Sequence, residues 1–302
     1  MAQSIGIRYT SCGIRALGLN KSDDGLRITG ISAGYPREGL RSFLEAQGFS
    51  LNECVIAIGL SPGNFLSAAV TRTEEMNDET MREQLRWEIE RKMISSPSTY
   101  NVNYTKNKVL GFAFAGRREL INDIQESIGK VITDVEPVAL YNGCISANEV
   151  TSPSVILISV EAEGISSVIL HEGSIIAMES IPIREDILSD VVSVLQREEM
   201  ESISPEVSER LIGYTLESIE RMKPLYTGAG NIAPEHIILA GGGAYLGYVA
   251  GELEHRSGIP TTISNPFASF KDEEMPHDTD FRDMGAAFTT CFGLAVRALT
   301  RE

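Results

Sequence analysis

The sequence predicts an α/β protein built from two similar halves, because three features agree. Each half opens with alternating apolar and polar segments broken by glycine, as in a β-meander, over Ser4–Ala33 and again over Val155–Glu179. In the second half, the apolar run Ile237–Ala240 leads into three glycines and a helical pattern, which is typical of a buried strand feeding a helix. The length of 302 residues is sufficient for two domains.

The elements of the first half follow from apolar spacing and turn residues. Apolar residues at every fourth position from Met81 to Met93 predict a surface helix with Asn77 or Asp78 as its N-cap, packed on a small sheet. Pro97 ends this helix. The other expected elements are the meander strands Ser4–Tyr9, Gly13–Leu19 and Leu26–Ala33, the strands Cys54–Ile58, Leu66–Val70, Tyr100–Tyr104, Val109–Phe114 and Val131–Glu136, and the helices Leu40–Gly48, Arg118–Lys130 and Pro137–Cys144.

A polar break at Asn148–Ser154 separates the halves, so we expect domains over 1–150 and 151–302, with an inserted α+β subdomain at about 60–130. We expect the C-terminal helix to pack back on the first half. The expected second-half elements are the strands Val155–Val160, Ser166–His171, Ser174–Glu179 and Pro260–Ser264, and the helices Ile187–Glu199, Pro205–Tyr226, Tyr245–Gly258 and Met284–Leu299.

Composition and charge exclude several classes of function. A net charge of −16 argues against nucleic-acid binding and against direct adsorption to anionic lipid. The four cysteines and four histidines are scattered without metal-ligand spacing, which favours reduced thiols in a cytosolic protein and no metal site. The sequence has no run of 18 apolar residues and no signal-peptide pattern, so we expect membrane association only through a protein partner.

The glycine turn at Gly241–Gly243 has two interpretations that the local sequence leaves open. Glycine lacks a Cβ, so a ligand or another backbone segment can approach closely there, and helix N–H groups beyond the turn favour a phosphate. A purely structural tight turn explains the same residues equally well.

Several longer stretches indicate which protein family the chain resembles. These stretches are Met81–Met93 with Trp87-Glu88 and the following Pro97, Val109–Ala115 with Arg118-Glu119-Leu120, Val131–Ala139, Ile237–Leu246, Ile259-Pro260 through Asn265-Pro266-Phe267, and Gly285-Ala286-Ala287 to Gly293-Leu294-Ala295. In them the chain resembles the PilM family of type IV pilus assembly proteins, which belongs to the actin-like ATPase superfamily and is related to FtsA. The resemblance implies two actin-like (ribonuclease H-like) domains, each with a mixed sheet that opens with the meander.

The chain departs from the family at the phosphate-binding motifs. Arg8 stands where the first hairpin usually carries an acidic residue, and Ser159 or Val160 stands at the acidic position of the second, with Glu161 and Glu163 nearby. Arg184-Glu185 replaces a Gly-Gly pair. Carboxylates in such sites hold Mg²⁺ through water, so these changes remove a metal-holding group and add repulsion toward phosphate.

Arg8 has two interpretations. It either pairs with Glu161 or Glu163 and closes an empty cleft, or it contacts a phosphate directly and allows metal-free nucleotide binding. The family comparison implies a vestigial adenosine loop at Gly241, Gly242, Gly243 and Ala244, and vestigial phosphate hairpins at Ser11, Gly13 and Gly164. We expect no catalytic residue, no metal and no cofactor, with ATP as the alternative.

The resemblance therefore implies a cytoplasmic scaffold of a pilus or related secretion machine. PilM proteins bind the cytoplasmic N-terminal peptide of the inner-membrane protein PilN, in a groove between the insertion and the first-half core. Here that groove would involve residues within about 77–115 and the neighbouring part of the first half. The alternatives are a nucleotide-binding ATPase whose nucleotide state regulates assembly, and a filament-forming protein, so self-association stays open.

Overall fold

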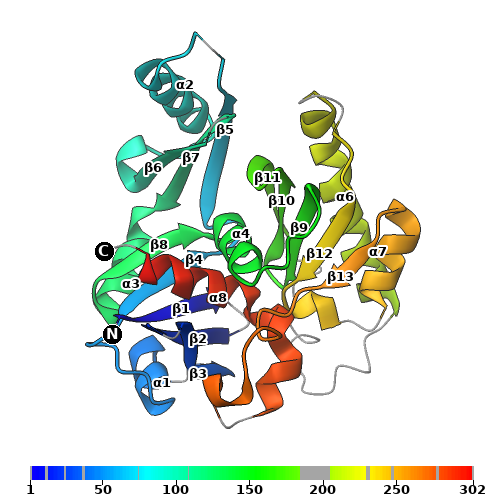
Figure 1. Ribbon diagram of the computed structural model, residues 1–302. Coiled ribbons are helices and arrows are strands. Elements are labelled where there is room, and N and C mark those ends of the chain that lie inside the picture. Colours follow the sequence, from blue (N-terminus) through cyan, green and yellow to red (C-terminus); the bar gives the residue numbers. More distant parts are fainter. Residues whose placement is uncertain are drawn as a thin grey trace.

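The described residues form two sheets of five strands, one in each half, and a smaller sheet that projects from the first half (Figure 1). The computed structural model describes residues 2–10, 13–23, 25–35, 38–73, 75–107, 109–183, 205–228, 232–245, 248–276 and 279–300. Among these residues, none of the helices combines the length and the apolar character that a membrane crossing requires.

The sheet of the first half has the order β3-β2-β1-β4-β8. Its first three strands pair antiparallel, as the meander predicts, and the last two add in parallel. Two helices, α1 (Leu40–Ala46) and α3 (Arg118–Ile128), cover one face through an aliphatic cluster. The strands are β1 (Ala2–Thr10), β2 (Gly13–Ser22), β3 (Gly25–Gly34), β4 (Val55–Leu60) and β8 (Val131–Val135).

The sheet of the second half repeats this topology in the order β11-β10-β9-β12-β13. It again joins an antiparallel meander to two parallel strands, which confirms the internal repeat. Two helices, α6 (Pro205–Gly228) and α7 (Val249–Ser257), pack on it. The strands are β9 (Ser154–Glu161), β10 (Gly164–His171), β11 (Ser174–Pro182), β12 (His236–Ala240) and β13 (Thr261–Ile263).

The projecting subdomain is an antiparallel sheet of order β5-β7-β6 with one helix on it. Its elements are β5 (Phe65–Thr71), α2 (Asp78–Glu90), the short 3₁₀ helix Pro97–Thr99, β6 (Tyr100–Lys106) and β7 (Leu110–Arg117). The predicted stripe is confirmed for Met81, Leu85 and Ile89, which are buried against the sheet. Met93 lies beyond the end of α2 at Glu90, so the helix ends well before Pro97. Asn77 is the N-cap, and its side chain accepts a hydrogen bond from the Thr80 N–H at 2.9 Å.

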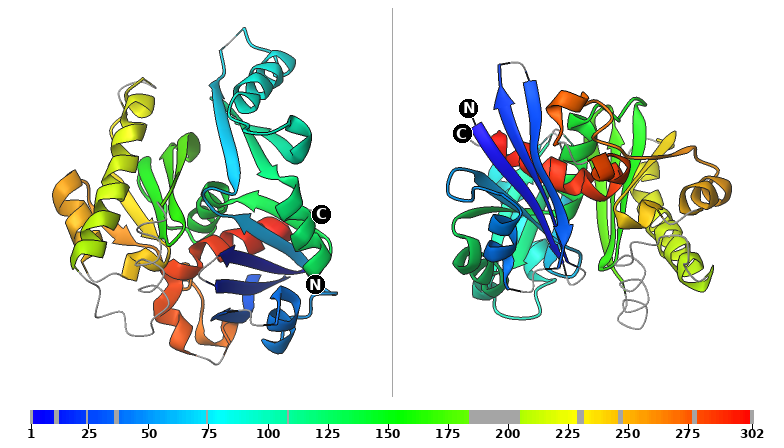
Figure 2. Two further views of the ribbon diagram at one scale, coloured as in Figure 1. Left: turned by 180° about the vertical axis from the view of Figure 1, so that it is seen from behind. Right: turned by 90° about the horizontal axis from the view of Figure 1, so that it is seen from below.

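Two helices, α4 (Glu136–Ser146) and α8 (Gly285–Leu299), lie between the halves (Figure 2). They contact strands of both large sheets: α4 meets β8 and β9, while α8 meets β1 and β12. Small residues allow them to cross closely, since a Cβ on Gly293 would lie 1.9 Å from the Ala139 carbonyl oxygen. Sequence positions far apart thus form one joint.

Several predicted boundaries are wrong. The helix expected from Tyr245 begins only at Val249, because Gly242–Tyr245 forms a short 3₁₀ turn whose apolar residues continue the helical spacing. Glu136 was expected to end a strand but begins α4, where Pro137 suits the first turn. The expected helix at 187–199 lies outside the described residues. The other elements differ from expectation by a few residues at their ends.

Candidate functional site

The end of β1 lies against the β9–β10 hairpin at the joint between the halves, since Arg8 contacts Glu161 and Glu163. This is where the sequence resemblance predicts the phosphate hairpins. Arg8 lies near the end of β1 and is only 4% exposed. Glu161 ends β9, and Glu163 lies in the turn that follows. Ser11 lies outside the described residues, and so does Arg184-Glu185.

The Arg8 guanidinium is surrounded by three carboxylates. Its Nε donates to Glu136 Oε1 at 2.9 Å, its Nη1 lies 3.5 Å from Glu161 Oε2, and its Nη2 lies 3.4 Å from Glu163 Oε2. The predicted pairing of Arg8 with Glu161 or Glu163 is confirmed, and it involves both residues. Sequence reasoning missed Glu136, whose only signal was an acidic residue directly after strand β8.

A second arginine completes the group, which we call the ion-pair cluster: Arg8, Arg15, Glu136, Glu161 and Glu163. Arg15 Nη1 donates to Glu161 Oε1 at 2.7 Å and to the Ala287 carbonyl at 3.4 Å. Each oxygen of Glu161 therefore faces a different guanidinium. Three negative charges and two positive charges make the cluster nearly neutral in the absence of any ligand.

Burial shapes the protonation of the cluster. Burial alone would lower the pKa of Arg8, but the carboxylates of Glu136, Glu161 and Glu163 outweigh it and raise that pKa above its ordinary value. Arg8 is therefore charged throughout the physiological range. Burial raises the pKa of Glu136, and Arg8 opposes this rise. Glu136 Oε2 has no hydrogen-bond partner among the described residues, so Arg8 is the main compensation for this carboxylate.

The glycine turn packs against the protein itself. Gly241 through Ala244 are buried, and a Cβ on Gly241 would lie 2.4 Å from the Val160 carbonyl oxygen. A Cβ on Gly243 would lie 2.5 Å from Val160 Cγ1. Gly241 also has φ of 86°, and its N–H donates to the Ala286 carbonyl at 2.8 Å. The close approach that these glycines allow is that of strand β9, and α7 does not begin directly beyond the turn.

The glycines of the hairpins have the same kind of neighbour. A Cβ on Gly13, whose φ is 127°, would lie 2.6 Å from the Gly34 carbonyl oxygen. A Cβ on Gly164 would lie 2.5 Å from the Ile181 carbonyl oxygen. Both positions need glycine for strand packing, so neither one by itself indicates a ligand.

The residues at the two hairpins do not fit a nucleotide's phosphates with Mg²⁺. Ser159 and Val160, at the usual acidic position, are fully buried and carry no carboxylate. The nearby carboxylates, Glu161 and Glu163, already hold a guanidinium, and an added phosphate would meet their negative charge. No group of metal-ligating side chains occurs in the part of the chain that the structure describes.

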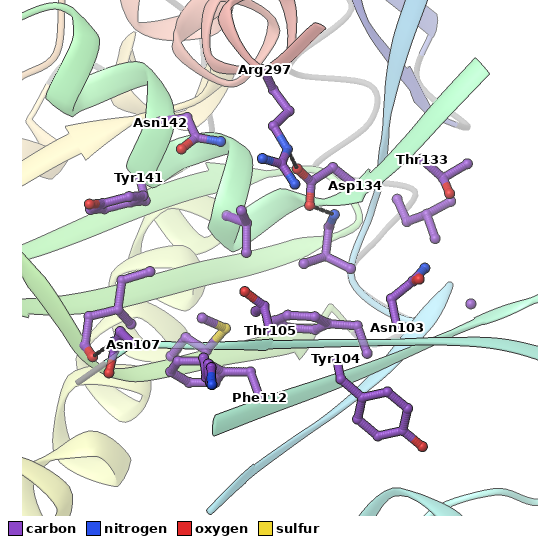
Figure 3. Close-up of a pocket in the computed structure, with 18 of the residues that line it drawn as sticks. Asn103, Tyr104, Thr105, Asn107, Phe112, Thr133, Asp134, Tyr141, Asn142 and Arg297 are labelled. Atoms are coloured by element: carbon purple, nitrogen blue, oxygen red, sulfur yellow. Dashed lines mark hydrogen bonds and ion pairs between the residues drawn. The ribbon is translucent and has the colours of Figure 1, made fainter. Parts of the chain in front are cut away.

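A groove of about 390 Å³ lies between the projecting subdomain and the body of the protein (Figure 3). Its walls come from β6 and β7, from β8 and α4, and from the β10–β11 hairpin. The apolar residues lining it include Leu60, Phe112, Phe114, Val135, Val138 and Met178, and the polar ones include Asn101, Asn103, Thr105, Asn107, Tyr141 and Asn142. Both β6 and β8 are edge strands of their sheets, so their backbones are available to an added extended segment.

Hydrogen bonds hold the second half against this groove. Asn107 Nδ2 donates to the Ile175 carbonyl at 2.7 Å, and Tyr141 Oη donates to the Gly173 carbonyl at 3.2 Å. Arg297 Nε lies 3.5 Å from Asp134 Oδ2 at another part of the lining (Figure 3). The sequence predicted only the first-half walls, because the hairpin at 173–178 carries no distinctive motif.

The two matching sheets, the crossing helices between them and the facing hairpins together define the actin-like ATPase fold, as predicted. Comparison with solved structures agrees. A protein with this fold from Bacteroides thetaiotaomicron superimposes with a TM-score of 0.54 at 14% identity, over 96% of each chain. Component A of (R)-2-hydroxyglutaryl-CoA dehydratase from Acidaminococcus fermentans gives a TM-score of 0.50 at 14% identity, over 100% of this chain and 99% of that one.

A chain of a PilM–PilN type IV pilus biogenesis complex superimposes with a TM-score of 0.70 at 16% identity, and the match covers 98% of both chains. The fold is thus similar to that chain over nearly its whole length, as the sequence resemblance implied. No protein-family model and no curated protein matches the sequence.

Proposed function

We propose that the protein is a cytoplasmic scaffold of a type IV pilus or related secretion machine, and that it binds the cytoplasmic N-terminal segment of a PilN-like inner-membrane protein. It would reach the membrane through this partner. The observation that carries the proposal is the groove between the projecting subdomain and the first-half core, in a chain whose fold matches that of a PilM–PilN complex along its length.

The chemistry of the groove suits a peptide. Its apolar residues can bury alternate side chains of an extended segment, while asparagine side chains and the edges of β6 and β8 offer hydrogen bonds to its backbone. The net charge of −16 complements the basic residues that cytoplasmic segments next to a membrane span carry. We further propose that binding proceeds without ATP hydrolysis, which the ion-pair cluster supports by filling the phosphate position with protein charges.

A titration with a synthetic peptide of the partner's cytoplasmic N-terminus tests the proposal. Thr105 is exposed on β6 and lines the groove, so Thr105→Trp should fill it and weaken binding by about tenfold or more. Thr71→Trp is the matched control, since Thr71 is exposed on β5, at the opposite edge of the same sheet. Failure of the unmodified protein to bind, or equal binding by both variants, would contradict the proposal.

A further inference from the structure

The ion-pair cluster joins the two halves of the protein. Arg8 and Arg15 belong to strands of the first sheet, whereas Glu161 and Glu163 belong to the β9–β10 hairpin of the second. Within the cluster, ion pairs cross the joint from Arg8 to both glutamates and from Arg15 to Glu161. Glu161 is central because each of its oxygens faces a guanidinium from a different strand of the other half.

The same cluster adjoins the groove through the chain itself. Glu136, which holds Arg8 Nε, is the first residue of α4 and directly follows β8. Residues on both sides of it, Val135 and Val138 among them, line the groove. The groove wall formed by β8 and α4 is therefore anchored to the joint through the buried carboxylate of Glu136.

Another wall of the groove belongs to the second half. Gly173 and Ile175 line it, and they belong to the meander that begins with β9 and the cluster's two glutamates. Asn107 and Tyr141 bridge to this wall with hydrogen bonds to backbone carbonyls. Any opening of the halves at the ion-pair cluster would hence change the distance between the walls.

We propose that Arg8 and Arg15 are positioning residues, which hold the halves at a fixed separation in place of a bound nucleotide and so keep the groove in its binding shape. The part that concerns the groove rests on the proposed function, whereas the part that concerns the joint does not. The two guanidinium groups lie among the carboxylates of the ion-pair cluster. Side chains of the protein thus supply the positive charge that a nucleotide-binding relative would take from a metal ion.

Replacing the two glutamates tests this without leaving a carboxylate unpaired. Glu161→Gln with Glu163→Gln removes the two negative charges that the second half contributes to the ion-pair cluster, while Arg8 keeps its hydrogen bond to Glu136. Hydrogen–deuterium exchange of the full chain should then accelerate in the segments 131–146 and 164–182, and not in α2 or α7. If the double variant fails to fold, Glu163→Gln alone takes its place in the experiment. It removes the ion pair between Arg8 and Glu163, so exchange in the same segments should accelerate by a smaller amount.

The matched control is Glu206→Gln with Glu220→Gln, which alters two exposed glutamates of α6 that pair with Arg210 and Lys223. It should leave exchange in both segments unchanged. Unaltered exchange in Glu161→Gln/Glu163→Gln, or a uniform acceleration over the whole chain, would overturn the proposal for the joint.

Peptide affinity then tests the coupling to the groove. The double variant should bind the partner peptide at least about fivefold more weakly than the unmodified protein, while the α6 control binds equally. Faster exchange with unchanged affinity would overturn the coupling. Absence of peptide binding by the unmodified protein would refute the proposed function, and the exchange result would still decide whether the cluster holds the halves together.

Discussion

Removing the Arg8 side chain should reveal how strongly the ion-pair cluster depends on it. Arg8 and Glu136 are 4% and 2% exposed, and Glu136 Oε2 has no hydrogen-bond partner among the described residues. Arg8→Met therefore leaves a buried carboxylate without its compensating charge. Breaking a buried pair in this way costs about 3–5 kcal/mol. Arg15 still holds Glu161 in this variant, so Glu136 bears most of the loss.

The pH dependence of this loss follows from the sign of the pKa shift. Burial already raises the pKa of Glu136, and removing Arg8 raises it further because the charge that lowers it is gone. When folding raises the pKa of a carboxyl group, the folded protein loses stability as the pH rises through that raised pKa. The destabilisation by Arg8→Met should hence be largest at neutral pH and shrink on acidification.

The assay is urea unfolding followed by circular dichroism, with Arg8→Met, Glu136→Gln and the double variant as a mutant cycle. Glu136→Gln removes the carboxylate that Arg8→Met would strand, so the double variant should recover about 2 kcal/mol relative to the sum of the single changes. The control Arg221→Met alters an exposed side chain of α6 that pairs with Glu217, and it should cost much less stability than Arg8→Met. A small loss in Arg8→Met that simply adds to that of Glu136→Gln would refute the reasoning.

Two further predictions concern packing and pH. Gly243→Ala should lower stability by about 1–3 kcal/mol, because the added Cβ would lie 2.5 Å from Val160 Cγ1. Adding Val160→Ala should restore part of this lost stability in thermal unfolding, and no recovery would contradict the packing role of Gly243. Burial raises the pKa of Glu149, whose carboxylate accepts hydrogen bonds from Ser264 Oγ at 2.7 Å and Asn265 N–H at 2.6 Å. The contribution of Glu149 to stability should fall as the pH rises above its ordinary pKa of 4.5. Glu149→Gln should therefore make stability depend less on pH in this range, and an unchanged dependence would contradict this.

Patterns that are local in sequence predicted most of the fold. The two meanders and the run Ile237–Gly243 could be predicted because alternation and glycine turns are recognised from neighbouring residues alone. The start of α7 could not be predicted from the sequence, since the 3₁₀ turn Gly242–Tyr245 and an α-helix have nearly the same apolar spacing. The close packing of Gly241 and Gly243 could not be predicted, because Val160, which packs on them, belongs to another strand.

The candidate site was predictable only where a departure from the family pattern stood out. Arg8 in place of an acidic residue pointed to an ion pair with the second hairpin, and that pair is present. Glu136 contacts Arg8 across 128 positions of sequence, and nothing in its own surroundings signals a partner so distant. The second wall of the groove was missed for the same reason, because the fold alone brings residues 173–178 beside β6.

Calorimetric titration of the unmodified protein with Mg-ATP tests the central claim, that protein side chains fill the phosphate position. The ion-pair cluster predicts no saturable heat with or without Mg²⁺, because a phosphate would have to displace Arg8 from three carboxylates. Tight, Mg²⁺-dependent binding, with a dissociation constant of about 1 μM or below, would contradict the account.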